Sequence, residues 1–260
     1  MRPLKNEYRA NGGVMMRDTF LFDLDGTLLP FDIDEFMKLY FGEMAKHFHG
    51  MIDGKLLAKY ILESTEAMVN NLEPRPNEEK FMEHFAKLVE VEDLREYKQK
   101  FDLFYDERFD LVKECVERIP IIEDSIEILK DKGYKLVVAT NPIFPIKAIY
   151  KRIEWAGLDV EDFSYISCYQ KNSYCKPRIQ FYQEVLDAIK KEPQECYMVG
   201  NDVQEDLVAG ELGIETYLIT DYIINRNNQK IETTYQGNYQ DFYDFVKALP
   251  AVLPKDKGLI

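Results

Sequence analysis

The segment Thr19-Phe20-Leu21-Phe22-Asp23-Leu24-Asp25-Gly26-Thr27 decides how the rest of this chain is interpreted. Its first four residues are typical of a short buried strand, and they stop abruptly at a polar turn. Asp23 and Asp25 stand at i and i+2, so their carboxylates can share a divalent cation through hard oxygen ligands. An EF-hand loop is excluded, because the glycine comes too early and the closing glutamate is missing. A nucleotide-sugar transferase, which also places an acidic pair after a strand, stays open at this point.

The same pattern recurs three times further along the chain, where a short apolar run ends in polar residues. These runs are Lys135–Ala139 before Thr140-Asn141-Pro142, Cys196–Val199 before Gly200-Asn201-Asp202, and Thr216–Ile219 before Thr220-Asp221. Helical spacing of apolar residues separates the runs. Strands that alternate with helices predict right-handed crossovers and an α/β fold, with a doubly wound parallel sheet covered on both faces. In such sheets ligands bind beyond the carboxyl ends of the strands, where these polar residues stand.

Residues 31–115 break this alternation. Apolar side chains recur there every three or four residues, as at Phe36, Tyr40 and Met44, without any strand pattern. We expect an inserted α-helical cap domain over 31–115, lying above the strand ends as a lid. The predicted α/β core is then 17–30 together with 116–260.

The two ends of the chain carry weaker patterns. Residues 1–16 are polar or unpatterned up to Met15-Met16 and are expected to be a disordered tail. Near the other end, 225–238 is expected to be a polar loop, and Tyr239–Leu249 has the spacing of a last amphipathic helix.

Composition excludes several classes of protein. The chain has 47 acidic and 33 basic residues, a formal charge of −14, and no basic patch, which argues against nucleic acid and anionic membrane surfaces as partners. No run approaches the ~20 apolar residues that span a bilayer. Four cysteines without a CxxC pair, and an N-terminal stretch that lacks a signal-peptide core, predict a reduced, cytoplasmic protein.

The polar residues at the strand ends form an ordered series. Thr140 offers a hydroxyl, Asn141 an amide, and Lys176 a positive charge just before a predicted helix. Asp202 and Asp206 add two carboxylates. Each residue alone has an ordinary explanation as a turn, a solvated lysine or a helix cap. Their joint order along one sheet edge is far less expected by chance.

Asp23-Leu24-Asp25-Gly26-Thr27-Leu28, Thr140-Asn141, Lys176-Pro177 and Gly200-Asn201-Asp202 with Asp206 resemble the four ordered motifs of the haloacid dehalogenase-like (HAD) hydrolase superfamily. The resemblance covers 18–222, and the helical insertion is similar to the family's type-one cap. The fourth motif reads Gly-Asn-Asp here, where Gly-Asp-Ser or Gly-Asp-Asn is commoner.

The resemblance implies a phosphatase, a phosphoric monoester hydrolase that acts on a small phosphorylated metabolite through an aspartyl-phosphate intermediate. Asp23 is implied as the nucleophile. Asp25 is implied as the acid and base, a position where halide-removing members carry no Asp. Mg²⁺ is implied as cofactor, with Asp23, the backbone carbonyl of Asp25, and Asp202 as metal ligands. Asp206 is implied to support these ligands or to bind the ion through water.

Thr140, Asn141 and Lys176 are implied to bind the substrate phosphate, with Thr140 and Lys176 stabilising charge on its oxygens during transfer. A phosphotransferase or phosphomutase would use the same residues and stays open, as does a ligand-binding protein without activity. Residues 31–115 carry 20 acids and 12 bases. This excess of acids disfavours bulky polyanionic substrates. We therefore expect a compact monophosphate as substrate, and monophosphates that carry a cationic group belong to this expectation.

Overall fold

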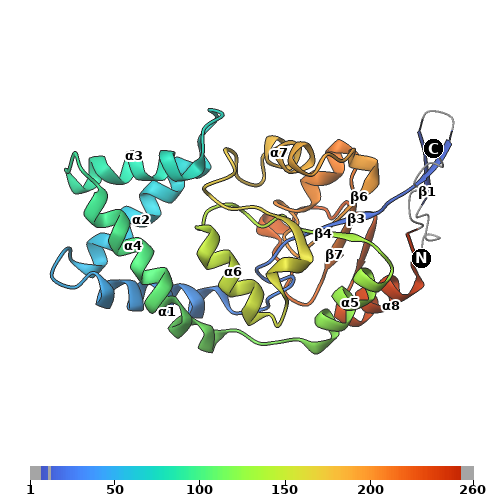
Figure 1. Ribbon diagram of the computed structural model, residues 1–260, viewed down its shortest axis with the longest axis horizontal. Coiled ribbons are helices and arrows are strands. Elements are labelled where there is room, and N and C mark those ends of the chain that lie inside the picture. Colours follow the sequence, from blue (N-terminus) through green and yellow to red (C-terminus); the bar gives the residue numbers. More distant parts are fainter. Residues whose placement is uncertain (1–6, 11–12, 253–260) are drawn as a thin grey trace, which may run out of the picture.

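The computed structural model describes residues 7–10 and 13–252. Its centre is a six-stranded parallel sheet in the order β5-β4-β3-β6-β7-β8 (Figure 1). The strands are β3 (Thr19–Phe22), β4 (Lys135–Val138), β5 (Phe163–Ile166), β6 (Cys196–Gly200), β7 (Glu215–Ile219) and β8 (Tyr235–Gly237). The chain enters at the central strand β3, builds one side of the sheet and then the other. The strand order therefore changes direction beside β3, which is where ligands bind in open α/β sheets.

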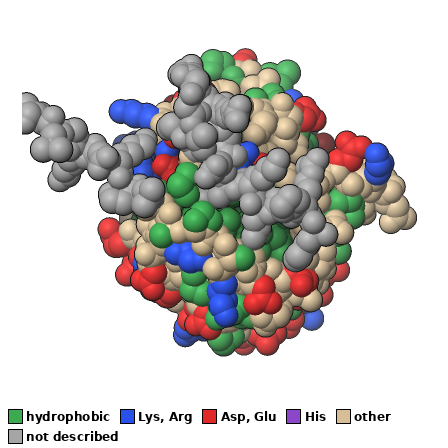
Figure 2. Space-filling model, turned by 90° about the vertical axis from the view of Figure 1, so that its right-hand side faces the viewer, with side chains coloured by type: hydrophobic (Ala, Val, Ile, Leu, Met, Phe, Trp, Pro, Cys, Tyr) green, Lys and Arg blue, Asp and Glu red, His purple; other side chains and the backbone are tan. Residues whose placement is uncertain are grey.

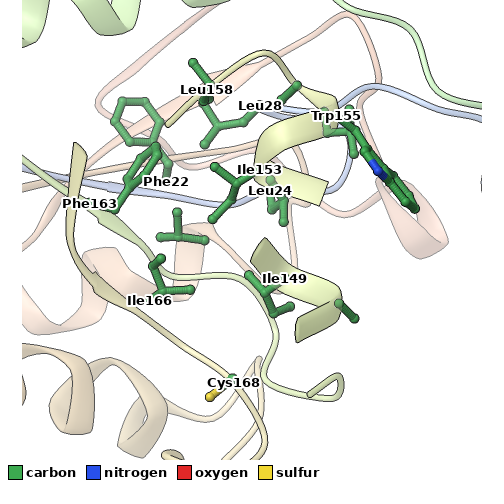
Figure 3. Close-up of a cluster of buried hydrophobic side chains, with 14 of the residues drawn as sticks. Phe22, Leu24, Leu28, Ile149, Ile153, Trp155, Leu158, Phe163, Ile166 and Cys168 are labelled. Carbon is green, nitrogen blue, oxygen red and sulfur yellow. The ribbon is translucent and has the colours of Figure 1, made fainter. Parts of the chain in front are cut away.

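Helices cover both faces of this sheet. Phe20 and Phe22 of β3 belong to a buried cluster with side chains of α5 (Pro120–Asp131), α6 (Ile146–Trp155) and α8 (Tyr239–Ala248). Figure 3 shows Phe22 near residues of α6 in this cluster. Leu21 belongs to a second cluster, with α7 (Ile179–Ile189). Because successive strand residues are buried on opposite faces, the predicted doubly wound parallel α/β core is confirmed.

A group of helices lies beside the sheet, at the left of Figure 1. It consists of α1 (Ile33–His47), α2 (Gly54–Val69), α3 (Asn77–Val89), α4 (Arg95–Glu107) and a 3-10 helix over Phe109–Cys115. The side chains of Asp32 and Asp53 accept backbone hydrogen bonds at the starts of α1 and α2, as N-caps do. Phe31 and Val116 form an isolated antiparallel bridge. The segment that leads from the sheet into the helical group therefore lies beside the segment that leads back.

Aromatic rings fill the centre of this helical group. Phe101 of α4 contacts Phe48 and Phe85, with ring centroids 4.9 and 5.4 Å apart. Tyr40 of α1 and Phe104 of α4 meet edge to face at 5.7 Å. Such pairs add to the free energy of burial. These rings belong to the same buried cluster as side chains of β3, so the packing of the helices is continuous with that of the sheet.

Several elements differ from the sequence-based expectation. Within the expected disordered tail, β1 (Glu7–Ala10) and β2 (Gly13–Met16) form an antiparallel hairpin, while 1–6 and 11–12 lie outside the described residues. Strands β5 and β8 were not predicted, and β8 falls inside the expected loop 225–238. Both are edge strands with partly exposed residues, so neither has the continuous apolar run that marked the four predicted strands. Shorter 3-10 segments are Val160–Asp162, Pro193–Glu195, Leu207–Leu212 and Arg226–Asn228.

One face of the molecule shows a mixed distribution of charge (Figure 2). Figure 2 views the end of the molecule opposite α1–α4, and there Lys and Arg side chains are scattered among Asp and Glu. Across the part of the chain that the structure describes, no helix is long and apolar enough to cross a membrane.

Phe104 and its neighbour Leu103 provide a test of the helical core. Phe104 is fully buried and Leu103 is 37% exposed on the same helix. Phe104→Ala should lower the free energy of unfolding by about 3–5 kcal/mol, because it leaves a cavity. Leu103→Ala should cost less than about 1 kcal/mol. Urea unfolding followed by circular dichroism measures both, and equal losses would contradict this account of the core.

Candidate active site at the carboxyl ends of the strands

Asp23 is the first residue after β3, and its backbone N–H donates to the Val199 carbonyl of β6 at 2.9 Å. Its carboxylate is nearly buried and accepts a hydrogen bond from Lys176 Nζ at 2.8 Å. The same ammonium donates to Asp206 Oδ1 at 2.7 Å. Lys176 and Asp206 are each 1% exposed. One buried cation therefore joins two carboxylates that the sequence places 183 residues apart, and all three residues are among the predicted site residues.

Burial and the neighbouring charges shift the pKa values of both Asp23 and Lys176. Burial raises the pKa of Asp23 well above its usual value, against the attraction of Lys176, and the nearby charges of Asp206 and Asp25 add to the rise. Burial alone would lower the pKa of Lys176, but Asp206 and Asp23 together raise it well above its usual value. The ammonium thus stays charged, and the Asp23 carboxylate would be stabilised by further positive charge.

Two glycines make room for this arrangement. A Cβ at Gly200 would lie 2.1 Å from Asp206 Oδ2, so only glycine lets the Asp206 carboxylate approach the end of β6. Gly26 has φ +82°, and a Cβ there would lie 2.2 Å from Asn201 Nδ2. The amide of Asn201 accepts from the Thr27 hydroxyl at 3.1 Å and donates to a backbone carbonyl at 2.6 Å. Asn201 therefore links the turn after β3 to the loop after β7.

Asp202 lies in the loop after β6 and is also nearly buried. Its carboxylate accepts backbone N–H groups of Gln204 and Glu205 at 2.9 and 3.0 Å. Its other partner is Arg226, whose guanidinium is 2.7 Å away and half exposed. The backbone N–H of Asp202 donates to Asp206 Oδ2 at 2.9 Å, which ties it to the Lys176 group.

Asp25 points toward the helical group rather than toward Lys176. Its Oδ2 pairs with Arg152 Nη1 of α6 at 2.5 Å, and the guanidinium of Arg152 is completely buried. The guanidinium carbon lies 4.5 Å from the ring centre of Phe144, a cation–π contact. Asp25 Oδ1 and Arg152 Nη2 are buried and find no hydrogen-bond partner among the described residues. Asp25 therefore has one oxygen held in place and one left available.

Thr140 and Asn141 follow β4, the neighbour of β3. The Thr140 hydroxyl makes no hydrogen bond to any residue that the structure describes, although the residue is only 3% exposed. The Asn141 side chain accepts the backbone N–H of Lys176 at 3.2 Å and donates to Glu205 at 3.0 Å. The amide of Asn141 thus positions the Lys176 backbone. The Thr140 hydroxyl, in contrast, is available to a ligand.

Sequence reasoning missed three charged residues of this site: Arg152, Glu205 and Arg226. Arg152 had a signal, because it shares the spacing of the buried α6 residues Ala148, Ile149 and Ile153, so a charge stands at an inward-facing position. Arg226 had none, since it belongs to a polar loop whose path depends on the whole fold.

The oxygen donors at this edge of the sheet bear on whether a divalent cation fits here. Among the residues with described positions, no three His, Cys, Asp or Glu side chains form a chelating group. The expected ligands are only two carboxylates, Asp23 and Asp202, with the carbonyl of Asp25, and Mg²⁺ completes such oxygen sets with water. The connected acids are Asp23, Asp25, Asp202, Glu205 and Asp206, and the connected bases are Arg152, Lys176 and Arg226. Fully ionised, five acids against three bases leave two surplus negative charges, which fits a divalent cation.

Comparisons with known proteins identify the family and the fold of this chain. Residues 17–213 match the family model of the haloacid dehalogenase-like hydrolases. A search of the curated proteins finds no match. Similar solved structures include a HAD phosphatase from Thermococcus onnurineus, with 18% identity over 90% of this chain and 100% of that one at a TM-score of 0.55.

Two further structures share the fold at a TM-score of 0.55. One is a HAD-hydrolase from Bacillus subtilis bound to magnesium, with 20% identity over 89% of this chain and 99% of that one. The other is an L-2-haloacid dehalogenase from Xanthobacter autotrophicus, with 13% identity over 90% and 100%. At these identities the structures establish the fold alone. Because the family model spans most of the chain, the protein belongs to the haloacid dehalogenase-like hydrolases.

Proposed function

We propose that the protein is a Mg²⁺-dependent phosphatase that hydrolyses a small phosphomonoester through an aspartyl-phosphate on Asp23. The observation that carries this proposal is the buried contact of Lys176 with both Asp23 and Asp206. Both phosphatases and dehalogenases occur among the similar structures. Asp25, two residues after the nucleophile, favours phosphoester chemistry, since a leaving alcohol needs a proton and a leaving halide does not.

Asp23 is the proposed nucleophile. Lys176 holds its Oδ1, whereas its Oδ2 makes no hydrogen bond to a described residue and is available for attack on phosphorus. A bond forms between Oδ2 and phosphorus as the bond from phosphorus to the alcohol oxygen breaks. Water then attacks the acyl phosphate and releases inorganic phosphate, so one difficult displacement becomes two easier ones.

Mg²⁺ would be held by Asp23, the carbonyl of Asp25, and Asp202, with Asp206 behind them. When bound, it supplies positive charge that offsets repulsion between the carboxylates and the phosphate. Asp202 is already oriented by two backbone N–H groups. Its ion pair with Arg226 must loosen for a cation to bind, because both compete for the same carboxylate oxygens.

Asp25 is the proposed acid and base. Arg152 fixes its Oδ2, and Oδ1 is without a partner among the described residues, so Oδ1 can give a proton to the leaving alcohol and later take one from water. Arg152 is a positioning residue in this scheme, since it acts by orienting Asp25.

The proposed phosphate-binding groups are the Thr140 hydroxyl, the backbone N–H of Asn141 and the ammonium of Lys176. An ammonium has three donors, and Lys176 uses two of them on Asp23 and Asp206. The third is free for a phosphate oxygen. We further propose that 31–115 acts as the cap of this site, because α1–α4 lie over Asp25 and are joined to the core through the adjacent segments at Phe31 and Val116.

Asp23→Asn should lower phosphate release by on the order of 10⁴-fold or more, because an amide cannot form the acyl phosphate. The measurement is release of phosphate from acetyl phosphate and a panel of monoesters with Mg²⁺. Asp124→Asn, a change at an exposed carboxylate of α5, is the matched control and should keep the wild-type rate. An active Asp23→Asn protein would refute the mechanism.

Asp25→Asn should slow both half-reactions and let phosphorylated enzyme accumulate with a substrate whose leaving group needs no proton, such as acetyl phosphate. Intact-mass analysis after an acid quench would then show one added phosphoryl group. The same experiment on the Asp23→Asn protein should show none. Turnover of Asp25→Asn at the wild-type rate on alkyl phosphates would rule out its role as acid and base.

Arg226→Gln should bind Mg²⁺ about 1.4- to fivefold more tightly, because a partly exposed ion pair of about 0.2–1 kcal/mol no longer competes for Asp202. Isothermal titration with MgCl₂ measures this directly. Lys230→Gln is the control, since Lys230 lies nearby in the chain and pairs only with Glu232 among the described side chains. Weaker Mg²⁺ binding by Arg226→Gln would show that Arg226 supports the cation instead of competing with it.

A further inference from the structure

A cavity of about 160 Å³ lies between the helical group and Asp25. Its walls come from α1, α2, α3, α4 and the segment that follows β4. Most of the lining is aromatic or aliphatic, including Phe36, Met37, Ile61, Met82 and Phe144. Ile33 and Leu62 are the lining residues with substantial exposure, at 55% and 49%, and they mark its mouth between α1 and α2.

The polar groups in this lining are few. The hydroxyls of Tyr40 and Tyr105 hydrogen-bond to each other at 2.8 Å. Burial raises the pKa of Tyr40 to about 12, so this pair is uncharged. Tyr169 and Thr65 add two further hydroxyls to the lining, and Asp25 is the single carboxyl among the lining residues. The rest of the lining is aromatic or aliphatic, so a polyol placed here would lose hydration at hydroxyls that face apolar side chains, which is costly.

Asp25 connects this cavity to the reacting atoms. It is the lining residue contributed by the turn after β3, two positions from Asp23. Its carboxylate is the group proposed to protonate the leaving oxygen. A phosphate held by Thr140 and Lys176 would therefore have its alcohol oxygen at Asp25 and the rest of the alcohol inside the cavity.

We propose that the substrates are phosphomonoesters of a compact apolar alcohol, either one aromatic ring or a short alkyl chain, whose body fills this cavity. The inference rests on the proposed phosphatase function. The size agrees, because a known apolar protein cavity of about 150 Å³ accommodates benzene. The acidic residues of 31–115 suggested a cationic group on the substrate, but no Asp or Glu other than Asp25 lines the described cavity.

The test compares kcat/KM for benzyl phosphate, glycerol 3-phosphate and acetyl phosphate with Mg²⁺. Benzyl phosphate should exceed glycerol 3-phosphate by about 100-fold, the scale on which an apolar site discriminates against unpaired hydroxyls. The leaving group of acetyl phosphate is too small to fill the cavity, so this substrate reports on phosphoryl transfer alone.

Leu62→Asp places a charge at the mouth and should reduce the preference for benzyl over glycerol phosphate by about tenfold or more. Leu56→Asp is the matched control, because Leu56 lies on the same helix, is 38% exposed and is not part of the lining. It should keep the wild-type preference.

Two outcomes would overturn the inference, and they differ. If acetyl phosphate is hydrolysed but glycerol 3-phosphate matches or exceeds benzyl phosphate, the substrate class is wrong and the proposed function stands. If none of the three esters is hydrolysed, the proposed function fails and the inference fails with it.

Discussion

The ammonium of Lys176 is the interaction on which the rest of the site depends. It is buried between Asp23 after β3 and Asp206 after β6, so it joins the central strand to its neighbour at the edge where strand order reverses. Removing one partner from such a buried pair typically costs about 3–5 kcal/mol, because the remaining charge is left without compensation. Gly200 makes the contact possible by leaving space for the Asp206 carboxylate. The site is therefore part of the core and not an addition to its surface.

Around this contact, two arginines each form an ion pair with a different carboxylate of the site. Arg152 is buried and fixes Asp25 beneath the helical group, whereas Arg226 is half exposed and holds Asp202 from the loop after β7. The buried pair gives Asp25 a set orientation toward the apolar cavity, and the exposed pair can exchange with a cation. Rigid packing on both faces of the sheet keeps these charges in place. One edge of the fold thus combines phosphoryl chemistry with an apolar space for the leaving group.

Much of this arrangement could be predicted from the sequence. Apolar runs ending in polar residues marked four of the six strands, and the known behaviour of parallel sheets placed Asp23, Thr140, Lys176 and Asp206 at one edge. The edge strands β5 and β8 are partly exposed and lack a continuous apolar run, so the same signal did not mark them. Arg226 and the cavity depend on how distant segments meet, and periodicity carries no information about such contacts. The hairpin of β1 and β2 was missed because each strand has only four residues and the two do not share one pattern of apolar and polar side chains.

A double-mutant cycle on Lys176 and Asp206 tests the central interaction most directly. The free energy of unfolding is measured by urea denaturation for the wild type, Lys176→Met, Asp206→Leu and the double variant. If the buried ammonium holds the strand ends together, the double variant should be more stable than the sum of the single losses predicts, by about 2–3 kcal/mol. Losses that add to within about 0.5 kcal/mol would show that the two groups do not stabilise each other and would contradict the account.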